Sequence, residues 1–235
     1  MSVLSPWVRI ISINGRFRCF LRTGTGRSKG WWVLEGFKRA GRRVLDPFVN
    51  LLATAGVSPF LVTVAGLFIT ILASWFIWKG CFLEGGLLLT VGSIMDAMDG
   101  ALARKSGTSS KAGAVLDSSS DRIGELLVLG ALLTGRAGES HSSLEYLVPA
   151  AIGGSFMVSY IRARAEGVKL SCSVGIFTRT ERLVLLITGI LAADIWGTEV
   201  IVWLLVLMTA GTWLTAVQRL MKVTRDGRGI PLEDE

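Results

Sequence analysis

Two stretches of the chain contain no charged residue over the length that is needed to cross a bilayer. Residues 57–78 form a run of twenty-two such residues, and residues 200–217 form a run of eighteen. A helix of about 20 apolar residues spans the roughly 30 Å of hydrocarbon in a membrane. The whole chain is 51% hydrophobic, and its mean hydropathy is +0.54. These features exclude a soluble globular domain and predict an integral membrane protein.

Six predicted membrane spans account for most of the chain after residue 57. Four stretches besides the two uncharged ones are apolar, with their charges gathered toward one end. The predicted fold class is therefore all-α and integral to the membrane, with six transmembrane helices preceded by an amphipathic interfacial helix. Three parts follow: a basic, mobile tail at 1–30, a six-helix domain with its juxtamembrane helix at 31–225, and a tail at 226–235. The spans are placed at about 58–78, 82–103, 113–135, 146–165, 181–196 and 199–220.

Residues 31–55 interleave large apolar side chains with cations. Trp31, Trp32 and Phe37 are followed by Lys38 and Arg39, and the pattern continues toward the first span. It suits a helix that lies in the membrane interface, with its apolar face in lipid and its cations at the headgroups. A soluble helix packed on the protein itself is the alternative interpretation.

The basic residues are distributed unevenly between the two sides of the predicted bundle. The net charge is +7, and ten of the twenty-five Lys and Arg lie in residues 1–43. Loops on the opposite side contain only Lys79 and Arg136. Segments on the same side as the N-terminus hold three, five and four cations, at 104–112, 162–182 and 219–235. The positive-inside rule then predicts a cytoplasmic-membrane protein with these segments in the cytoplasm, where they meet lipid headgroups and not nucleic acid.

Four aspartates form two pairs at helical spacing. Asp96 and Asp99 close the second predicted span, and Asp117 and Asp121 open the third. Spacings of i,i+3 and i,i+4 place each pair on one helix face, and a hairpin at 105–112 brings the two faces together at the cytoplasmic end. Converging carboxylates repel one another, and divalent cations relieve that repulsion. Oxygen ligands favour Mg²⁺, Mn²⁺ or Ca²⁺ over zinc, and no Cys or His is placed to assist.

The residues between the two pairs favour a phosphate-containing ligand. Gly100 and Gly113 leave their helix faces without side chains, which permits a base or a diphosphate to approach the backbone. Arg104 lies one turn beyond the first pair and is positioned to bind phosphate. A single aspartate at a helix end is commonly a surface charge, but two facing pairs with glycine and arginine between them indicate a site.

The complete pattern is Asp-x2-Asp-Gly-x2-Ala-Arg-x8-Gly-x3-Asp-x3-Asp. It resembles the signature of the CDP-alcohol phosphotransferases, and with the surrounding spans the resemblance covers about residues 35–225. The resemblance implies a homodimeric helical bundle in which an alcohol displaces CMP from a CDP-activated lipid such as CDP-diacylglycerol, with Mg²⁺ or Mn²⁺ as cofactor. It also implies that Asp121 is the catalytic base. The implied metal ligands are Asp96, Asp99, Asp117 and Asp121, and the implied CDP-lipid contacts are Gly100, Ala103, Arg104 and Gly113.

The chain departs from the family pattern just ahead of the first span. The family commonly has Thr or Ser, then Pro, then Asn or Asp at this place, whereas this chain has Ser58, Pro59 and Phe60. A nucleotide contact through that Asn or Asp is therefore not predicted here.

Several arginines end the last three spans on the same side as the aspartates. Cations beside a metal site suggest a second anionic substrate group, separate from the diphosphate. Segments 159–166 and 178–182 look like those of the prokaryotic phosphatidylinositol phosphate synthases, which implies inositol 1-phosphate as the acceptor. The implied acceptor-phosphate ligands are Arg162, Arg164, Arg182 and Arg219. Glycerol 3-phosphate would suit the same arginines, so phosphatidylglycerophosphate synthase is the main alternative, and anchoring to lipid headgroups is another.

Two other classes of protein carry carboxylates within a membrane. An ion-coupled transporter holds them near the midplane, on broken helices within inverted repeats. The four aspartates lie one or two turns from one face, and the sequence shows no internal repeat. A lipid-binding scaffold without catalysis is the remaining alternative. Release of CMP from a CDP-lipid in detergent separates an enzyme from both.

Overall fold

The described part of the chain falls into two compact units. The computed structural model describes residues 8–13, 16–21 and 45–228, and the units are Met1–Pro47 and Phe48–Glu235. In the first unit, β1 (Val8–Ile13) and β2 (Arg16–Leu21) form an antiparallel hairpin. Their register runs from Val8 opposite Leu21 to Ile13 opposite Arg16.

The hairpin lies within the segment that the sequence analysis treats as a tail at 1–30. The sequence does carry a signal for it, because the two strands flank Asn14-Gly15, a dipeptide that favours a two-residue hairpin turn. This signal is a turn dipeptide and not a helical periodicity. The mobility of residues 1–30 stays a prediction.

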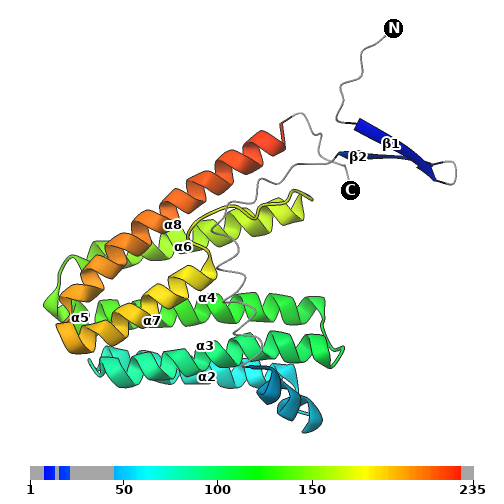
Figure 1. The fold of residues 1–235 in the computed structure, drawn as a ribbon. Helices are drawn as coiled ribbons and strands as arrows, with labels where there is room; N and C mark the ends of the chain where they lie inside the picture. The colour runs from blue at the N-terminus through cyan, green and yellow to red at the C-terminus, as the bar shows by residue number, and fades with distance from the viewer. Residues whose placement is uncertain (1–7, 14–15, 22–44, 229–235) are drawn as a thin grey trace. The chain divides into compact units, whose positions relative to one another are not determined.

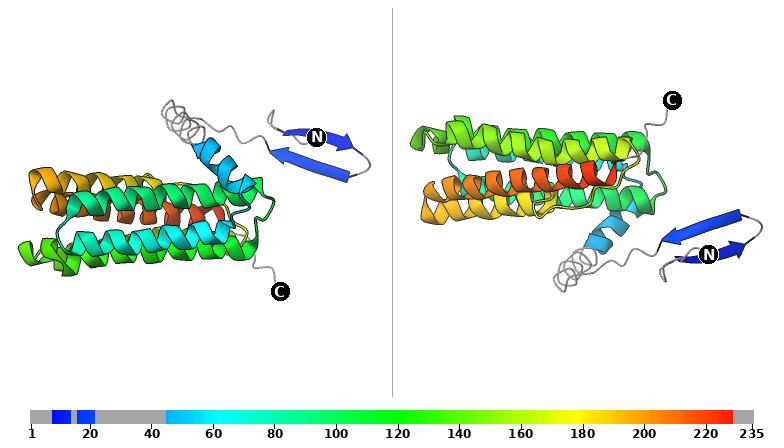
Figure 2. Two further views of the ribbon diagram at one scale, coloured as in Figure 1. Left: turned by 90° about the horizontal axis from the view of Figure 1, so that it is seen from below. Right: turned by 90° about the horizontal axis from the view of Figure 1, so that it is seen from above.

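The second unit is built from helices. Each of the six predicted spans coincides, to within a few residues, with one long helix (Figures 1 and 2). Residues 45–54 are also helical, and residues 31–44 of the predicted interfacial helix lie outside the described residues. The remaining elements are α2 (Pro59–Trp78), α3 (Phe82–Lys105), α4 (Lys111–Thr134), the short α5 (Arg136–Ser140), α6 (Leu144–Gly167), α7 (Arg179–Trp196) and α8 (Glu199–Asp226).

Four of the described helices are long and apolar enough to cross a membrane: α2, α3, α6 and α8. The other two long helices, α4 and α7, carry several charged side chains, including Asp121, Glu125 and Arg182. Large apolar side chains such as Phe68 and Trp203 are 66% and 72% exposed on the outside of the helices. An outer surface of this kind suits lipid and not water.

The core of the second unit joins all six long helices. Helix α2 packs against α3 and α4, α7 packs against α3 and α8, and α6 packs against α4 and α8. Close approach of α2 and α3 depends on Gly92, where an added Cβ would lie 2.9 Å from Oγ1 of Thr70. Small residues allow such contacts between membrane helices. Fully buried side chains from five of the helices include Ala73, Leu132, Leu144, Ile190 and Leu205.

Three local features set the helix ends that carry the acidic motif. Pro59 opens α2 after an extended Ser58, where its missing N–H is no loss. Gly107 has φ 67° in the connection between α3 and α4, a conformation that glycine adopts without strain. Ser110 caps α4, and its hydroxyl oxygen accepts a hydrogen bond of 3.0 Å from the N–H of Gly113. The short connection therefore turns the chain back within a few residues of the motif.

Candidate active site

The acidic motif converges in space. Asp96 and Asp99 lie in the last part of α3, and Asp117 lies in the second turn of α4. One carboxylate oxygen from each of these three residues lies within 4.8 Å of the other two. Asp121, one turn further along α4, is outside this cluster of three. The structure thus brings together the two faces that the sequence spacing predicts.

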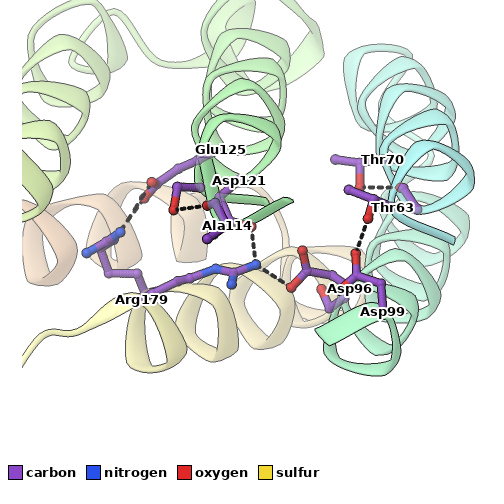
Figure 3. Close-up of polar contacts among 12 residues, drawn as sticks. Thr63, Thr70, Asp96, Asp99, Ala114, Asp121, Glu125 and Arg179 are labelled. Carbon is purple, nitrogen blue, oxygen red and sulfur yellow. Dashed lines mark hydrogen bonds and ion pairs between the residues drawn. The ribbon is translucent and has the colours of Figure 1, made fainter. Parts of the chain in front are cut away.

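Asp99 is fixed by a partner that sequence analysis does not identify. Its side chain is 4% exposed, and it accepts a hydrogen bond of 2.5 Å from the hydroxyl of Thr63 on α2 (Figure 3). Thr63 also donates to the backbone oxygen of Pro59, one turn earlier. Because both α2 and α3 contribute, the orientation of the Asp99 carboxylate depends on their packing.

Asp96 and Asp121 are paired with an arginine that is absent from the predicted set. The Nη2 atom of Arg179, at the start of α7, forms ion pairs with Oδ2 of Asp96 and Oδ1 of Asp121 (Figure 3). The side chain of Asp121 is 6% exposed, so this carboxylate lies inside the protein. The sequence signal for Arg179 is its place in segment 178–182, three residues before Arg182. Charge alone does not tell these two arginines apart.

The donor chemistry of the cluster fits a hard divalent cation. All three clustered ligands are carboxylates, from Asp96, Asp99 and Asp117. Mg²⁺ and Mn²⁺ prefer oxygen donors of this type. Among the described residues, this cluster contains no His or Cys.

A cavity of about 630 Å³ opens beside the cluster. Asp99 and Asp117 line it together with Thr63 and the exposed ring of Phe60. An added Cβ at Gly100 would lie 3.4 Å from Nη1 of Arg104, so the glycine leaves room around the guanidinium. All four predicted CDP-lipid contacts also line this cavity: Gly100, Ala103, Arg104 and Gly113.

A second, smaller cavity of about 80 Å³ lies on the other side of the aspartates. Asp96, Asp121 and Arg179 line it, so the bridge made by Arg179 forms part of its wall. Glu125 and Arg182 line its inner part. The two cavities share Thr63, and the four aspartates are divided between their walls.

Two of the four predicted acceptor-phosphate arginines have partners inside the protein. Arg182 is 2% exposed and binds Glu125 of α4 through two hydrogen bonds of 2.9 and 3.4 Å. Arg219 donates to the backbone oxygens of Val174 and Val158, at 2.9 and 2.6 Å. These arginines connect α7 to α4, and α8 to α6 and to the segment that follows it.

The other two predicted arginines lie near the end of α6 and are exposed. Arg162 forms an i,i+4 ion pair of 2.8 Å with Glu166, and about 59% of its side chain is exposed. Arg164 is exposed on the same helix. Two of the four arginines are thus buried with partners inside the protein and two are exposed, and the role of all four in acceptor binding stays a prediction.

Comparisons with known proteins agree with this geometry. The family model for CDP-alcohol phosphatidyltransferase matches residues 57–221. An archaetidylinositol phosphate synthase of Pyrococcus horikoshii is 32% identical over 194 residues, covering 82% of this chain and 97% of the relative. A phosphatidylinositol phosphate synthase of Cutibacterium acnes is 30% identical over 203 residues, covering 82% and 98%.

Solved structures resemble the chain over a similar length. The phosphatidylinositol phosphate synthase of Mycobacterium tuberculosis with CDP-DAG bound is 28% identical, with a TM-score of 0.72, covering 82% of this chain and 98% of that one. The same enzyme in complex with manganese and citrate gives 27% and 0.69, covering 80% and 91%. The matched residues 57–221 contain the whole aspartate motif and all the long helices up to the last turns of α8. This chain is therefore a membrane enzyme of the CDP-alcohol phosphatidyltransferase family.

Proposed function

We propose that this protein transfers the phosphatidyl group of CDP-diacylglycerol to inositol 1-phosphate and releases CMP. The observation that carries the proposal is that Asp99 and Asp117 belong both to the carboxylate cluster and to the wall of the larger cavity. A diphosphate in that cavity therefore lies beside the carboxylates. Similarity to relatives named phosphatidylinositol phosphate synthase, one of them solved with CDP-DAG, supports this choice of substrates.

The proposed cofactor is Mg²⁺, with Mn²⁺ as a substitute, and the donor set given above fits either ion. When bound, the metal neutralises the diphosphate and stabilises the leaving oxygen. The residues proposed to hold it are Asp96, Asp99, Asp117 and Asp121.

The side chains around the metal site have distinct roles in the proposed reaction. Asp121 accepts the proton of the acceptor hydroxyl as its oxygen bonds to the phosphorus that carries the lipid. The bond from that phosphorus to the CMP oxygen breaks, and CMP leaves with the electron pair. Arg104 binds the diphosphate through charge-assisted hydrogen bonds. Gly100 and Gly113 keep the cavity wall free of side chains, so that the nucleotide reaches the backbone.

We also propose that all six long helices cross the membrane and that the helix containing residues 45–54 lies in the interface. Helices α4 and α7 contain 24 and 18 residues. At 1.5 Å per residue they extend about 36 and 27 Å, which is comparable with the hydrocarbon core. Three of their charged side chains point inward, since Asp121, Glu125 and Arg182 are 10% exposed or less, and the exposed Lys111 and Asp194 lie near helix ends. Inward-facing, paired charges are those that a membrane tolerates.

The active site is proposed to face the cytoplasm, in a homodimer. The motif lies at the end of the bundle where α3 ends at Lys105 and α4 begins at Lys111. Cations at this end and their scarcity at the other end support a cytoplasmic orientation. The homodimer follows from the family resemblance.

Cysteine labelling tests the orientation. Ser109 and Ser142 are exposed, in connections at opposite ends of the long helices. With the native Cys19, Cys81 and Cys172 replaced, Ser142→Cys is expected to react with an impermeant maleimide from outside intact cells. Ser109→Cys is expected to react only after the membrane is opened. Labelling of position 109 from outside, with position 142 protected, would reverse the proposed topology.

The acceptor is proposed to carry its own phosphate, held by Arg164 and Arg162 at the end of α6. Both side chains are exposed, so a soluble anion reaches them without breaking a buried pair. Arg182 and Arg219 already bind internal partners, and we propose that they contribute mainly by fixing α7 and α8 around the site. Arg164 is therefore the most informative position for a test.

The test supplies purified protein with CDP-diacylglycerol and measures the release of CMP. Three acceptors are compared: inositol 1-phosphate, inositol and glycerol 3-phosphate. Inositol 1-phosphate is expected to react best. Arg164→Ala is expected to raise the acceptor KM roughly ten- to a hundredfold, since a charge-assisted hydrogen bond contributes about 1.5–3 kcal/mol. The KM for CDP-diacylglycerol is expected to stay near that of the wild type. Arg136→Ala serves as the matched control, because Arg136 is an exposed arginine at the first position of α5.

Three results would contradict this part of the proposal. Equal use of free inositol would remove the need for an acceptor phosphate. A preference for glycerol 3-phosphate would identify the alternative phosphatidylglycerophosphate synthase. An equal rise in both KM values for Arg164→Ala would show that the residue acts on the whole site and not on the acceptor.

A further inference from the structure

One guanidinium nitrogen joins two of the proposed metal ligands. Nη2 of Arg179 pairs with Asp96 of α3 and Asp121 of α4, and Figure 3 shows the side chain reaching from α7 to the acidic residues. The side chains of Asp96 and Asp121 are 24% and 6% exposed. The carboxylate of Asp121 is therefore largely shielded from water, and Arg179, whose own side chain is 41% exposed, supplies the positive charge between the two carboxylates.

A divalent cation on the same two carboxylates would compete with that guanidinium. The cation and the guanidinium are both positively charged, and both would bind Asp96, which belongs to the carboxylate cluster and is paired with Arg179. Metal bonds to carboxylate oxygens are about 2.0–2.1 Å for Mg²⁺, which leaves no room for a hydrogen-bonded nitrogen in the same place. Simultaneous occupancy would also place like charges side by side in a site that is mostly buried.

We propose that Arg179 is an internal counter-cation that holds Asp96 and Asp121 until metal is loaded, and that metal binding requires its release. This inference rests on the proposed metal site. Release of Arg179 frees Asp121, the proposed base, so that the base becomes available only when the metal is in place. The released guanidinium stays beside the smaller cavity, which it already lines with Arg182 and Glu125.

A purely structural role makes a different prediction. If Arg179 only tied α7 to α3 and α4, its loss would destabilise the metal-free and metal-loaded protein alike. Affinity for metal would then stay the same or fall, because the ligands would be less well ordered. If Arg179 is a counter-cation, its loss raises the affinity for metal. Molecules that hold the Arg179 bridge cannot bind metal, so removing the bridge increases the fraction of the protein that is able to bind it.

The experiment measures Mn²⁺ binding by titration calorimetry to the full-length protein in detergent, without substrates. Arg179→Gln is expected to bind Mn²⁺ roughly tenfold more tightly than the wild type, as for a bridge present in about nine-tenths of the molecules. Arg179→Lys keeps the charge but lacks the planar fork, so an intermediate affinity is expected. Arg122→Gln is the matched control. It removes a positive charge next to Asp121 in the sequence, but among the described residues Arg122 forms no ion pair with Asp96 or Asp121. Its affinity is expected to lie much closer to that of the wild type.

A second readout uses thermal denaturation in detergent. Added Mn²⁺ is expected to raise the Tm of Arg179→Gln more than that of the wild type, because tighter binding to the folded state stabilises it further. If Arg179→Gln does not fold, Arg179→Lys is compared with the wild type instead. An affinity of Arg179→Lys for Mn²⁺ equal to that of the wild type would then overturn the inference.

The outcomes separate this inference from the proposed function. Absence of Mn²⁺ binding in the wild type would overturn the metal site and the inference with it. Wild-type binding with an unchanged or weaker affinity in Arg179→Gln would overturn the inference alone. An equal gain in Arg122→Gln would show a general effect of charge, and would also overturn it.

Discussion

Replacement of Asp117 by asparagine is expected to abolish CMP release from CDP-diacylglycerol. Asp117 supplies one of the three clustered carboxylate oxygens and also lines the cavity proposed for the nucleotide. A neutral amide keeps the size of the side chain but removes the charge that holds a cation. Metal catalysis contributes several kcal/mol, so a loss of roughly a thousandfold or more in kcat/KM is expected.

The matched control for this substitution is Asp194→Asn. Asp194 is exposed near the opposite end of α7, and the same change there removes a carboxylate outside the site. Wild-type protein in excess EDTA is expected to lose activity in the same way as Asp117→Asn and to regain it with Mg²⁺ or Mn²⁺. Full CMP release by Asp117→Asn, or by the wild type in EDTA, would contradict the proposed role of the cluster.

Replacement of Glu125 by alanine is expected to lower the free energy of unfolding more than any of the other single substitutions described above. It leaves the guanidinium of Arg182 buried at 2% exposure without its carboxylate partner. Among the described residues, Nη1 of Arg182 already lacks a hydrogen-bond partner, so little is left to compensate the charge. Breaking one side of a buried ion pair costs about 3–5 kcal/mol. Thermal denaturation in detergent is expected to show a Tm lower by on the order of 10 °C.

Two variants show whether burial is the cause. Glu166→Ala breaks an ion pair with Arg162 whose side chains are 59% and 58% exposed, and is expected to cost less than about 1 kcal/mol. Glu125→Leu combined with Arg182→Met removes both buried charges and is expected to recover much of the stability, because no unpaired charge remains. An unchanged Tm for Glu125→Ala, together with a lower acceptor KM, would contradict this expectation. It would show that Glu125 competes with the acceptor phosphate for Arg182.

Local sequence patterns were sufficient to predict the helices and the position of the motif. Uncharged runs and the spacing of charges are properties of a single helix and can be read without knowing its neighbours. The six predicted spans therefore lie within a few residues of six long helices. The spacing of the motif fixes which residues share a helix face, and Asp99, Asp117 and the four residues proposed to contact the CDP-lipid line one cavity. The hairpin of β1 and β2 also has a local signal, but that signal is the Asn14-Gly15 dipeptide between the two strands and not a helical periodicity.

The partners of the buried charges were decided only by the tertiary structure. Thr63 lies 36 residues from Asp99, Arg179 lies 83 residues from Asp96, and Arg182 lies 57 residues from Glu125. Helical periodicity tells which side of a helix a residue faces, but packing decides which helix lies opposite. An arginine offers the same charge to an internal carboxylate and to a substrate phosphate. Sequence therefore predicted that arginines surround the site. The tertiary packing, which brings α7 to Asp96 of α3 and to Asp121 and Glu125 of α4, determined that Arg179 and Arg182 face carboxylates of the protein.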